Sequence, residues 1–503
     1  MQTLDLIIIF GYLIGITAFG ILYAGKQSTT EEYFVGSRNV PWWAIAMSIV
    51  ATETSTITFV SVPGVVFAKG GNFEFLQLVF GYLLGRIVIS LVFIPLYFKG
   101  QLQTVYQLLD DRFGGRVKML ASGLFVIMRN IADGIRLLLT AIVLAAVYTA
   151  FQPDTDPAYV IIGSILLLGI VMIVFTFYGG MEAVIWIEVV QLVIYVGGAV
   201  AAAVVLIQNI DGGFAGAVDI GQAYNKFQLL DLNWDFAKAY TFWGGVLGGC
   251  FLTMSTHGTD QFLVQRYLCT DSSKAAITAL MTSGLAVLIQ FIGFLFIGVL
   301  LFAFYQPYAM DGYAAGAGAF PFTGTDKVFP AFITQKMPTG LSGLVVAAIF
   351  AAALSSSLNS IAATAINDIY KPFAKNASDA KLMRIAGILT VVVGIVQIAI
   401  AIALRDATTS ALNLALAVAS LINGPILGVF LVGAFLSRAK EIHALLGMVV
   451  SIVVMTYVLL AANKIVAGPT IAWPWYALMG SLLTVVVAFL TSLVFQESKD
   501  EVS

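Results

Sequence analysis

Long apolar stretches separated by short polar loops recur along the whole chain. A helix that crosses a lipid bilayer needs about 20 mostly apolar residues. By that measure the pattern predicts thirteen membrane spans, at residues 4–24, 42–68, 74–98, 119–149, 158–178, 184–207, 240–266, 276–304, 340–370, 383–403, 409–436, 441–463 and 472–495. The first stretch is long enough to span and no positive charge precedes it, which favours a retained helix over a signal peptide. The longer loops 208–239 and 305–339 have room for short helices.

Polar residues interrupt two of these spans where membrane depth makes them costly. The second span contains ATETSTITFVSVPG at 51–64, and the seventh contains GGCFLTMSTHGTDQ at 248–261. Both segments are typical of helices that unwind part-way, which exposes backbone carbonyls and helix ends to an ion or an anionic group. Because the two lie five spans apart, they predict two inverted five-helix repeats, an organisation found in secondary transporters that bind at the membrane midplane.

Oxygen-bearing side chains cluster in the ninth span and near the start of the sixth. Ser355, Ser356 and Asn359 follow an alanine run, and hydroxyl and carbonyl oxygens suit a hard cation such as sodium. Glu188 lies within the sixth predicted span, where a carboxylate would supply the countercharge for such an ion. Arg129 and Asp133 stand four residues apart in the fourth span, a spacing that favours a local ion pair.

Composition agrees with a membrane protein. The 503 residues are 60% hydrophobic and only 10% charged, whereas soluble domains carry roughly 25% charged residues. The net charge of −2 gives no indication of a nucleic-acid partner, and the two cysteines show no metal-binding spacing. Of the 25 Lys and Arg, fifteen fall in loops predicted inside, seven outside and three within spans if the N-terminus is outside. The positive-inside rule therefore predicts a cytoplasmic C-terminus.

At this point the chain resembles the sodium/solute symporter family, whose members include sodium-coupled sugar, proline, sialic acid and iodide transporters. The motifs that carry the resemblance are YFVGSRNVPWWAIAMSIVAT (33–52), VYQLLDDRFG (105–114), YGGMEAVIWIEVVQ (178–191), GTDQFLVQRYL (258–268), FAAALSSSLNSIAATAINDIY (350–370) and NGPILGVFLVGAF (423–435). The resemblance implies an all-α, LeuT-like fold that works by alternating access. We expect one transporter domain over 1–503, with an extra N-terminal helix and loop (1–41), inverted repeats at 42–207 and 240–436, and two C-terminal helices (437–503).

The resemblance also implies two sodium sites. One would use backbone carbonyls near Ala51 and Thr54, a carbonyl at Ile349, and two hydroxyls. An ungapped alignment places those hydroxyl positions at Ala352 and Ala353, which have no side-chain oxygen, whereas a gap would make Ser355 and Ser356 the pair. The second site, found in some members, would use Glu188 in place of an aspartate, together with Ser355 and Ser356.

The family's solute pocket would be lined in this chain by Glu53, Ser55, Thr58, Phe73 and Gln77. Hydroxyls, an amide and an aromatic face suit a sugar or polyol, while an organic acid or an amino acid stays open as the solute. The sialic acid transporters place an arginine in the fourth span, and the matching position in this chain is Ala132, which argues against sialic acid.

The leading hypothesis is sodium-coupled symport of a small polar organic solute at the inner (plasma) membrane. Sodium would be a co-transported ligand, and neither a cofactor nor an obligate protein partner is indicated. The helices would be surrounded by the lipid bilayer. The rival is proton-coupled symport through Glu53 or Glu188. A membrane sensor is disfavoured because no output domain follows the last span, and an enzyme because no HExxH, GxSxG or P-loop pattern occurs.

Overall fold

A computed structural model describes residues 2–23, 29–54, 56–100, 102–152, 154–306, 324–354, 357–374, 377–405 and 411–494. Within these ranges the regular secondary structure is entirely helical. The main helices are α1 (Thr3–Tyr23), α3 (Trp42–Glu53), α4 (Thr56–Phe67), α5 (Leu76–Val92), α8 (Gly115–Phe151), α9 (Pro157–Gly179), α10 (Met181–Gln208), α12 (Gly249–Gly258), α14 (Ser273–Tyr305), α16 (Leu341–Leu354), α18 (Asp379–Ala403), α19 (Ala411–Phe435), α20 (Glu441–Ala462) and α21 (Pro474–Val494).

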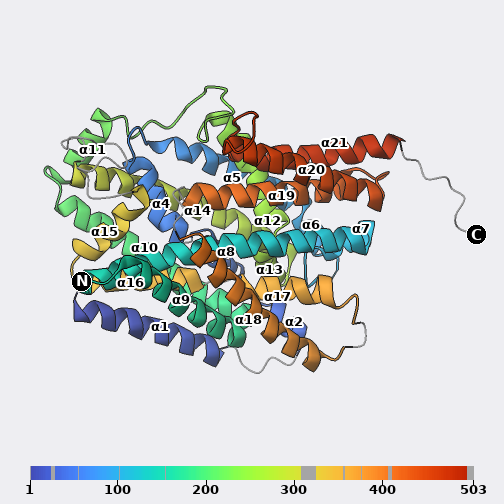
Figure 1. The fold of residues 1–503 in the computed structure, drawn as a ribbon, viewed down its shortest axis with the longest axis horizontal. Coiled ribbons are helices and arrows are strands. Elements are labelled where there is room, and N and C mark those ends of the chain that lie inside the picture. The colour runs from blue at the N-terminus through green and yellow to red at the C-terminus, as the bar shows by residue number, and fades with distance from the viewer. Residues whose placement is uncertain are drawn as a thin grey trace, which may run out of the picture.

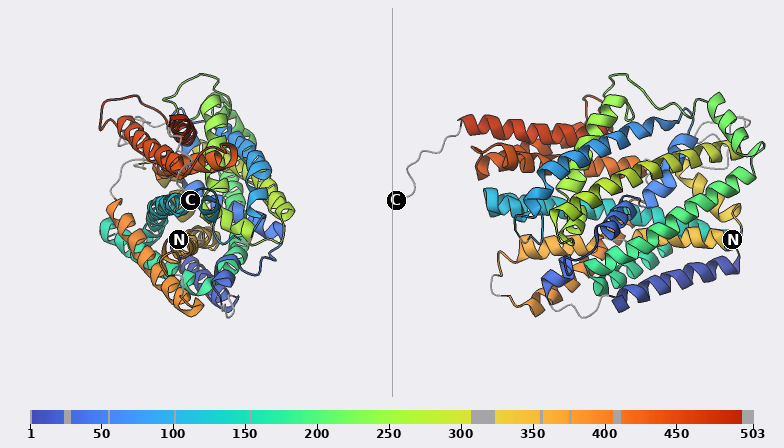
Figure 2. Two further views of the ribbon diagram at one scale, coloured as in Figure 1. Left: turned by 90° about the vertical axis from the view of Figure 1, so that its right-hand side faces the viewer. Right: turned by 180° about the vertical axis from the view of Figure 1, so that it is seen from behind.

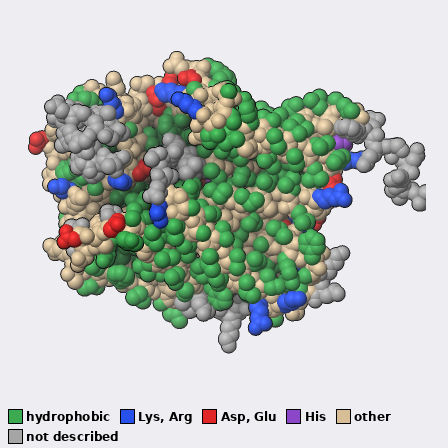
Figure 3. Space-filling view, in the orientation of Figure 1, with side chains coloured by type: hydrophobic (Ala, Val, Ile, Leu, Met, Phe, Trp, Pro, Cys, Tyr) green, Lys and Arg blue, Asp and Glu red, His purple; other side chains and the backbone are tan. Residues whose placement is uncertain are grey.

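Most of the long helices run along the long axis of the molecule (Figures 1 and 2). Hydrophobic side chains cover the middle of the face seen in Figure 3, and charged side chains gather toward its two ends. Among the described residues, eight helices are long and apolar enough to cross a membrane, or nine if the bent pair α3 and α4 forms one span. The other predicted spans correspond to shorter or broken helices, so the total of thirteen remains a prediction.

The predicted break in the second span is confirmed. Helix α3 ends at Glu53, and the chain bends by 55° before α4 continues. Thr54 leaves helical geometry with ψ at 61°, and its N–H still donates to the carbonyl of Val50 at 2.8 Å. Ala51, Thr52 and Thr54 are buried, so the last carbonyls of α3, which lack intrahelical partners, lie inside the protein rather than at its surface.

The seventh span is also broken, as its sequence predicted. It starts as a π-helix, η2 (Gly244–Gly248), continues as α12, leaves helical geometry at Thr259 and resumes as α13 (Gln261–Leu268). Its glycines permit a very close crossing with α5, because a Cβ at Gly249 would lie 2.5 Å from the carbonyl oxygen of Leu78. The two helices therefore meet backbone to backbone, which fixes α12 against the wall of the bundle.

Helix α1 is attached to the start of α16 by one buried carboxylate. Oδ1 of Asp5 accepts hydrogen bonds from the backbone N–H of Gly340 at 2.7 Å and of Gly343 at 3.0 Å, and from the Ser342 hydroxyl at 2.8 Å. A side chain from a distant helix thereby caps the N-terminus of α16, where a negative charge is favoured by the helix dipole.

The ninth predicted span is described on both sides of the serine run. Helix α16 ends at Leu354 and α17 (Leu358–Thr364) begins after Ser357, while Ser355 and Ser356 lie outside the described residues. The helix then continues as a π-helix, η5 (Ala365–Tyr370). The long loops hold the expected short helices, α11 (Gly213–Ala223) and α15 (Val328–Gln335). Further short helices were not predicted: α2 (Thr30–Val35), α6 (Ile94–Tyr97) and α7 (Gln107–Phe113).

Candidate functional site

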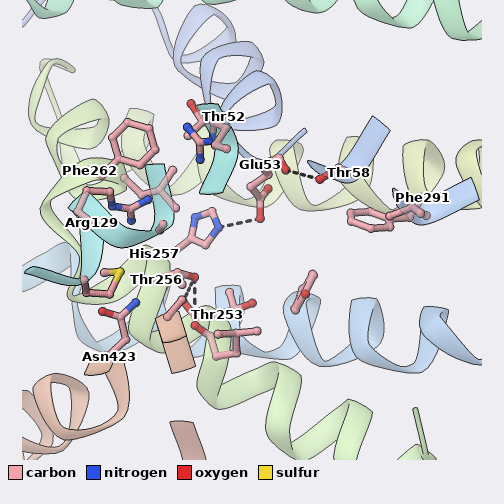
Figure 4. A pocket seen from close by; sticks show the side chains of 18 of the residues that line it. Thr52, Glu53, Thr58, Arg129, Thr253, Thr256, His257, Phe262, Phe291 and Asn423 are labelled. Carbon is pink, nitrogen blue, oxygen red and sulfur yellow. Dashed lines mark hydrogen bonds and ion pairs between the residues drawn. The ribbon is translucent and has the colours of Figure 1, made fainter. Parts of the chain in front are cut away.

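A cavity of about 190 Å³ lies where the two broken helices meet α5, α8, α14 and α19. Its wall combines hydroxyls, aromatic rings and charged groups (Figure 4). The lining residues are Thr52, Glu53, Thr58, Val62, Phe75, Tyr82, Met128, Arg129, Ala132, Arg136, Leu252, Thr253, Thr256, His257, Phe262, Leu263, Phe291, Ala419 and Asn423. A mostly apolar cavity with a few converging polar groups, formed at broken helices, is a natural place for a small solute.

Glu53 joins the two broken helices at one side of this cavity. It is the last residue of α3, and its carboxylate is paired with Arg86 of α5 and contacts Nε2 of His257 in α12 at 2.8 Å. A negative charge at a helix C-terminus is opposed by the helix dipole. Two nitrogen-bearing groups from two other helices compensate for that placement, so the carboxylate does not act on the cavity as an isolated charge.

The contacts of Glu53 extend on both sides. Nδ1 of His257 lies 2.9 Å from the hydroxyl of Tyr267, so both ring nitrogens of the histidine have partners. On the other side, the Thr58 hydroxyl donates to the backbone carbonyl of Glu53 at 2.9 Å, which bridges the break between α3 and α4 (Figure 4). The geometry of the break is thus fixed from both of its ends.

Two arginines of α8 line the opposite wall of the cavity. Arg129 is ion-paired with Asp260, and Arg136 lies 3.6 Å from Asp133. The guanidinium groups of both lie near the ring of Phe262, with centroid distances of 4.5 Å and 5.8 Å. The expected local pair between Arg129 and Asp133 is wrong, because the N-cap residue of α13 reaches Arg129 instead.

Glu188 has a different partner from the one the sequence suggested. Its carboxylate is paired with Arg266, with Nη2–Oε1 at 2.5 Å and Nε–Oε2 at 3.2 Å, and both side chains are fully buried. The hydroxyls of Ser48 and Thr52 also donate to it. The negative charge of Glu188 is therefore already balanced, and its role as a sodium ligand stays a prediction. Ser355 and Ser356, its expected co-ligands, lie outside the described residues.

The other predicted sodium ligands lie on separate elements. Ala51 is in the last turn of α3, and Thr54 stands at the break, where its hydroxyl contacts the Val50 carbonyl and Oε1 of Gln290, each at 2.6 Å. Ile349 is fully buried in α16. The backbone of Ala352 and Ala353 is helical. Sodium binding at these positions stays a prediction.

Of the predicted solute residues, Glu53 and Thr58 line the cavity. Phe73 and Gln77 are not among its described lining residues. Phe73 packs on Phe227 at 5.4 Å, and the buried Gln77 amide accepts from the N–H of Asp231 at 2.9 Å and donates to the Glu74 carbonyl at 3.0 Å. Ser55 lies outside the described residues.

Several residues that line the cavity were not among the solute-binding residues predicted from the sequence. Three of them, Thr253, Thr256 and His257, come from the polar stretch of the seventh span. The sequence identified that stretch but not which of its side chains face the cavity. Arg129 and Arg136 are seven residues apart and thus share a helix face, a signal that could have indicated a common target. Asn423 of α19 had no distinguishing local pattern.

A model of the sodium:solute symporter family matches residues 33–451. The chain belongs to this family. The symporter is 32% identical over 506 residues to the sodium/sialic acid symporter NanT of Aliivibrio fischeri, with 99% of this chain and 94% of the relative aligned. It is also 32% identical over 506 residues to the sodium/sialic acid symporter SiaT of Proteus mirabilis, covering 98% and 95% of the two chains.

A solved structure of a substrate-bound, outward-open, sodium-coupled sialic acid symporter superposes with a TM-score of 0.84 at 30% identity, covering 99% of each chain. The protein is therefore a sodium-coupled symporter of a small organic solute, a multi-pass membrane transporter and not an enzyme. Sodium is its co-transported ion, as the sequence analysis expected.

Proposed function

We propose that this symporter imports a small hydroxylated acid, such as an acidic sugar, together with sodium. It would do so by alternating access across the inner membrane, with the N-terminus outside and the C-terminus cytoplasmic. We further propose thirteen spans in a LeuT-like arrangement, with inverted repeats at 42–207 and 240–436. The solute would thus differ from the neutral sugar or polyol that the sequence favoured, because it carries a negative charge.

One observation carries the acidic part of the proposal: Arg129 and Arg136 line the cavity, and their carboxylate partners are not among its described lining residues. These partners are Asp260 and Asp133. The two pairs are neutral overall, but a bound solute meets their positive ends first. Arginine suits this role because its planar fork binds a carboxylate through two parallel hydrogen bonds.

Glu53 does not oppose an acidic solute. Its charge is compensated by Arg86, and His257 contacts its second oxygen. The hydroxyl-binding part of the proposal rests on Thr58, Thr253, Thr256 and Asn423, which give the wall several donors and acceptors. Phe75 and Phe291 offer apolar ring faces beside them. The relatives with 32% identity carry sialic acid, an acidic sugar, which agrees with this chemistry. Ala132 argues against sialic acid bound in the same way, but it lines the cavity one helical turn from both Arg129 and Arg136, which would bind the acidic group in its place.

For sodium we propose the end of α3, near Ala51 and Thr54, together with Ile349. The last carbonyls of a helix lack intrahelical partners and carry the negative end of its dipole, so they attract a cation. Each sodium ion that enters gains about 2.3 kcal/mol per 100 mV of membrane potential. A second site at Glu188, Ser355 and Ser356 would require the carboxylate to exchange Arg266 for an ion.

The test is uptake by the purified protein in liposomes, with N-acetylneuraminate as the acidic sugar and N-acetylmannosamine as the neutral one. We expect sodium-dependent uptake of the acid and at least about tenfold weaker uptake of the neutral sugar, since a lost charged hydrogen bond costs about 1.5–3 kcal/mol. Arg136→Lys should raise KM for the acid by about tenfold, because it keeps the charge but loses the fork.

Arg438→Lys is the matched control, because this exposed arginine lies far along the chain on the loop before α20 and outside the cavity lining. Equal uptake of the two sugars, or an unchanged KM in Arg136→Lys, would refute the acidic part of the proposal. Uptake that persists in potassium without sodium would contradict the coupling.

A further inference from the structure

A second, much larger hollow lies away from the solute cavity, between α1, α9 and the C-terminal part of α8. Its volume is about 1160 Å³. No Asp, Glu, Lys or Arg is among its described lining residues. Its floor is buried, with Ile9, Leu168 and Phe350 each at most 2% exposed, whereas Ile14 is 69% and Tyr159 74% exposed. The hollow therefore opens outward from the helix bundle, toward the hydrocarbon of the membrane.

The shape of the hollow follows the direction of the helices. Helices α1 and α9 lie side by side (Figure 1). Lining residues extend from Leu6 to Ala18 on α1, about 18 Å at 1.5 Å per residue, and from Tyr159 to Val174 on α9, about 22 Å. The hollow is thus longer than one leaflet of a hydrocarbon core that is about 30 Å thick in total.

Most polar lining residues gather at one end of the hollow, and away from that end only the hydroxyls of Ser164 and Thr17 are among the described lining groups. Tyr148 and Gln152 at the end of α8, Thr155 in the following loop and Tyr159 at the start of α9 are lining residues there. Tyrosines of this kind are enriched at the level of the lipid headgroups. Toward the other end, the walls consist mostly of aliphatic side chains with Thr17, whose hydroxyl is bonded to the Leu13 carbonyl. An apolar channel with one polar, uncharged end has the pattern of an amphiphile.

We propose that this hollow binds a diacyl phospholipid with a zwitterionic headgroup, its acyl chains between α1 and α9 and its headgroup at the end of α8. Since no Lys or Arg is among the described lining residues, the uncharged donors Tyr148, Gln152 and Thr155 suit a headgroup without net charge. The hollow opens along its length toward the hydrocarbon, and its walls are apolar over more than one leaflet, which matches acyl chains that lie parallel to α1 and α9. The lipid fills the space on this side of α1, a helix that also packs against α16 and α10 and is held to α16 by the Asp5 contact.

The experiment uses the full-length protein in nanodiscs that contain phosphatidylethanolamine with a photoactivatable acyl chain, followed by peptide mapping of the crosslinks. Gly163→Phe fills the hollow, because a Cβ at this lining glycine meets no atom within 4 Å. Gly293→Phe on α14 is the matched control, since Gly293 is also exposed and equally free of neighbours, but it lies outside the hollow.

We expect crosslinks to concentrate on α1 and α9, to fall at least fivefold in Gly163→Phe and to stay unchanged in Gly293→Phe. Native mass spectrometry should show a retained phosphatidylethanolamine that survives mild delipidation and is lost in Gly163→Phe only. Labelling spread evenly over all exposed helices would overturn the proposal. So would preferential retention of phosphatidylglycerol or of a free fatty acid, or a mass showing that a second copy covers the hollow.

Discussion

The breaks in the second and seventh spans each place a carboxylate beside an arginine from another helix, but the two carboxylates stand at opposite helix ends. Glu53 is the last residue of α3, where the dipole opposes a negative charge, and Asp260 is the N-cap of α13, where the dipole favours it. Asp260 needs only Arg129 and the Phe262 N–H, whereas Glu53 is held by both Arg86 and His257.

The side chains of Glu53 and Asp260 also differ in exposure. The side chain of Glu53 is 15% exposed and lines the solute cavity, while that of Asp260 is fully buried behind it. We infer from this difference that a carboxylate in an unfavourable place, held by two compensating groups, serves function, whereas a favourably placed carboxylate stabilises the fold. The following experiments test that distinction.

The largest effect is expected from Arg86→Ala. This fully buried arginine is the main countercharge of Glu53, so its removal leaves a largely buried carboxylate with His257 alone and should destabilise the protein by about 3 kcal/mol. The double variant Arg86→Ala with Glu53→Gln should regain much of that loss, as measured by unfolding of the purified protein in detergent. A double variant no more stable than the single one would break the comparison.

A smaller effect is expected at the second break. Asp260→Ala removes both the cap of α13 and the partner of Arg129, and should cost about 2 kcal/mol. Asp260→Asn keeps the capping oxygen and should be more stable than the alanine variant by about 1 kcal/mol. Equal stability of the two variants, in the same unfolding assay, would show that the cap contributes nothing.

Tyr267→Phe should cost about 1 kcal/mol, because it removes only the hydroxyl bonded to Nδ1 of His257. If the compensation of Glu53 depends on how His257 is oriented, this variant should also alter the KM for the solute. Tyr97→Phe is the control. It removes a hydroxyl bonded to the carbonyl of Gly258, the residue after His257 in α12, and should leave KM unchanged.

The smallest effect is expected outside the membrane. Lys238 is 43% exposed and donates to Asp231, which lowers the pKa of that carboxyl. A lowered folded-state pKa gives stability that is present above the unfolded value near 3.8 and is lost as pH falls through the folded value. Lys238→Ala should therefore cost less than about 1 kcal/mol at neutral pH and flatten the acid limb of the stability profile. A loss as large as that of Arg86→Ala would contradict the role given to burial.

The sequence predicted the fold further than the site. Apolar length located the helices, and clustered hydroxyls located both breaks, because these signals are local. The ion pairs were not predictable in the same way: Glu53 meets a residue 33 positions away, and Arg129 one 131 positions away. Such partners are chosen by tertiary packing, so spacing suggested Asp133 for Arg129 instead.

Helical periodicity was likewise unable to identify the tertiary neighbours of residues near the cavity. Phe73 and Gln77 do share a face, but periodicity does not say which neighbour that face meets, and the Gln77 amide is bonded to the loop at Asp231. The predicted ligands Ser55, Ser355 and Ser356 lie outside the described residues. Glu53 and Thr58 do line the cavity, because they stand directly at a break, where the local polar pattern and the cavity coincide.

The carboxylate that joins α1 to α16 has a consequence for biosynthesis. Asp5 leaves the ribosome 335 residues before Gly340, its first partner on α16. At roughly 5–20 residues per second, its three hydrogen bonds cannot form for tens of seconds after it is made. During that interval the oxygen that later binds α16 must stay in contact with water or headgroups. The final seating of α1 is therefore a late event in assembly, although α1 is among the first segments made.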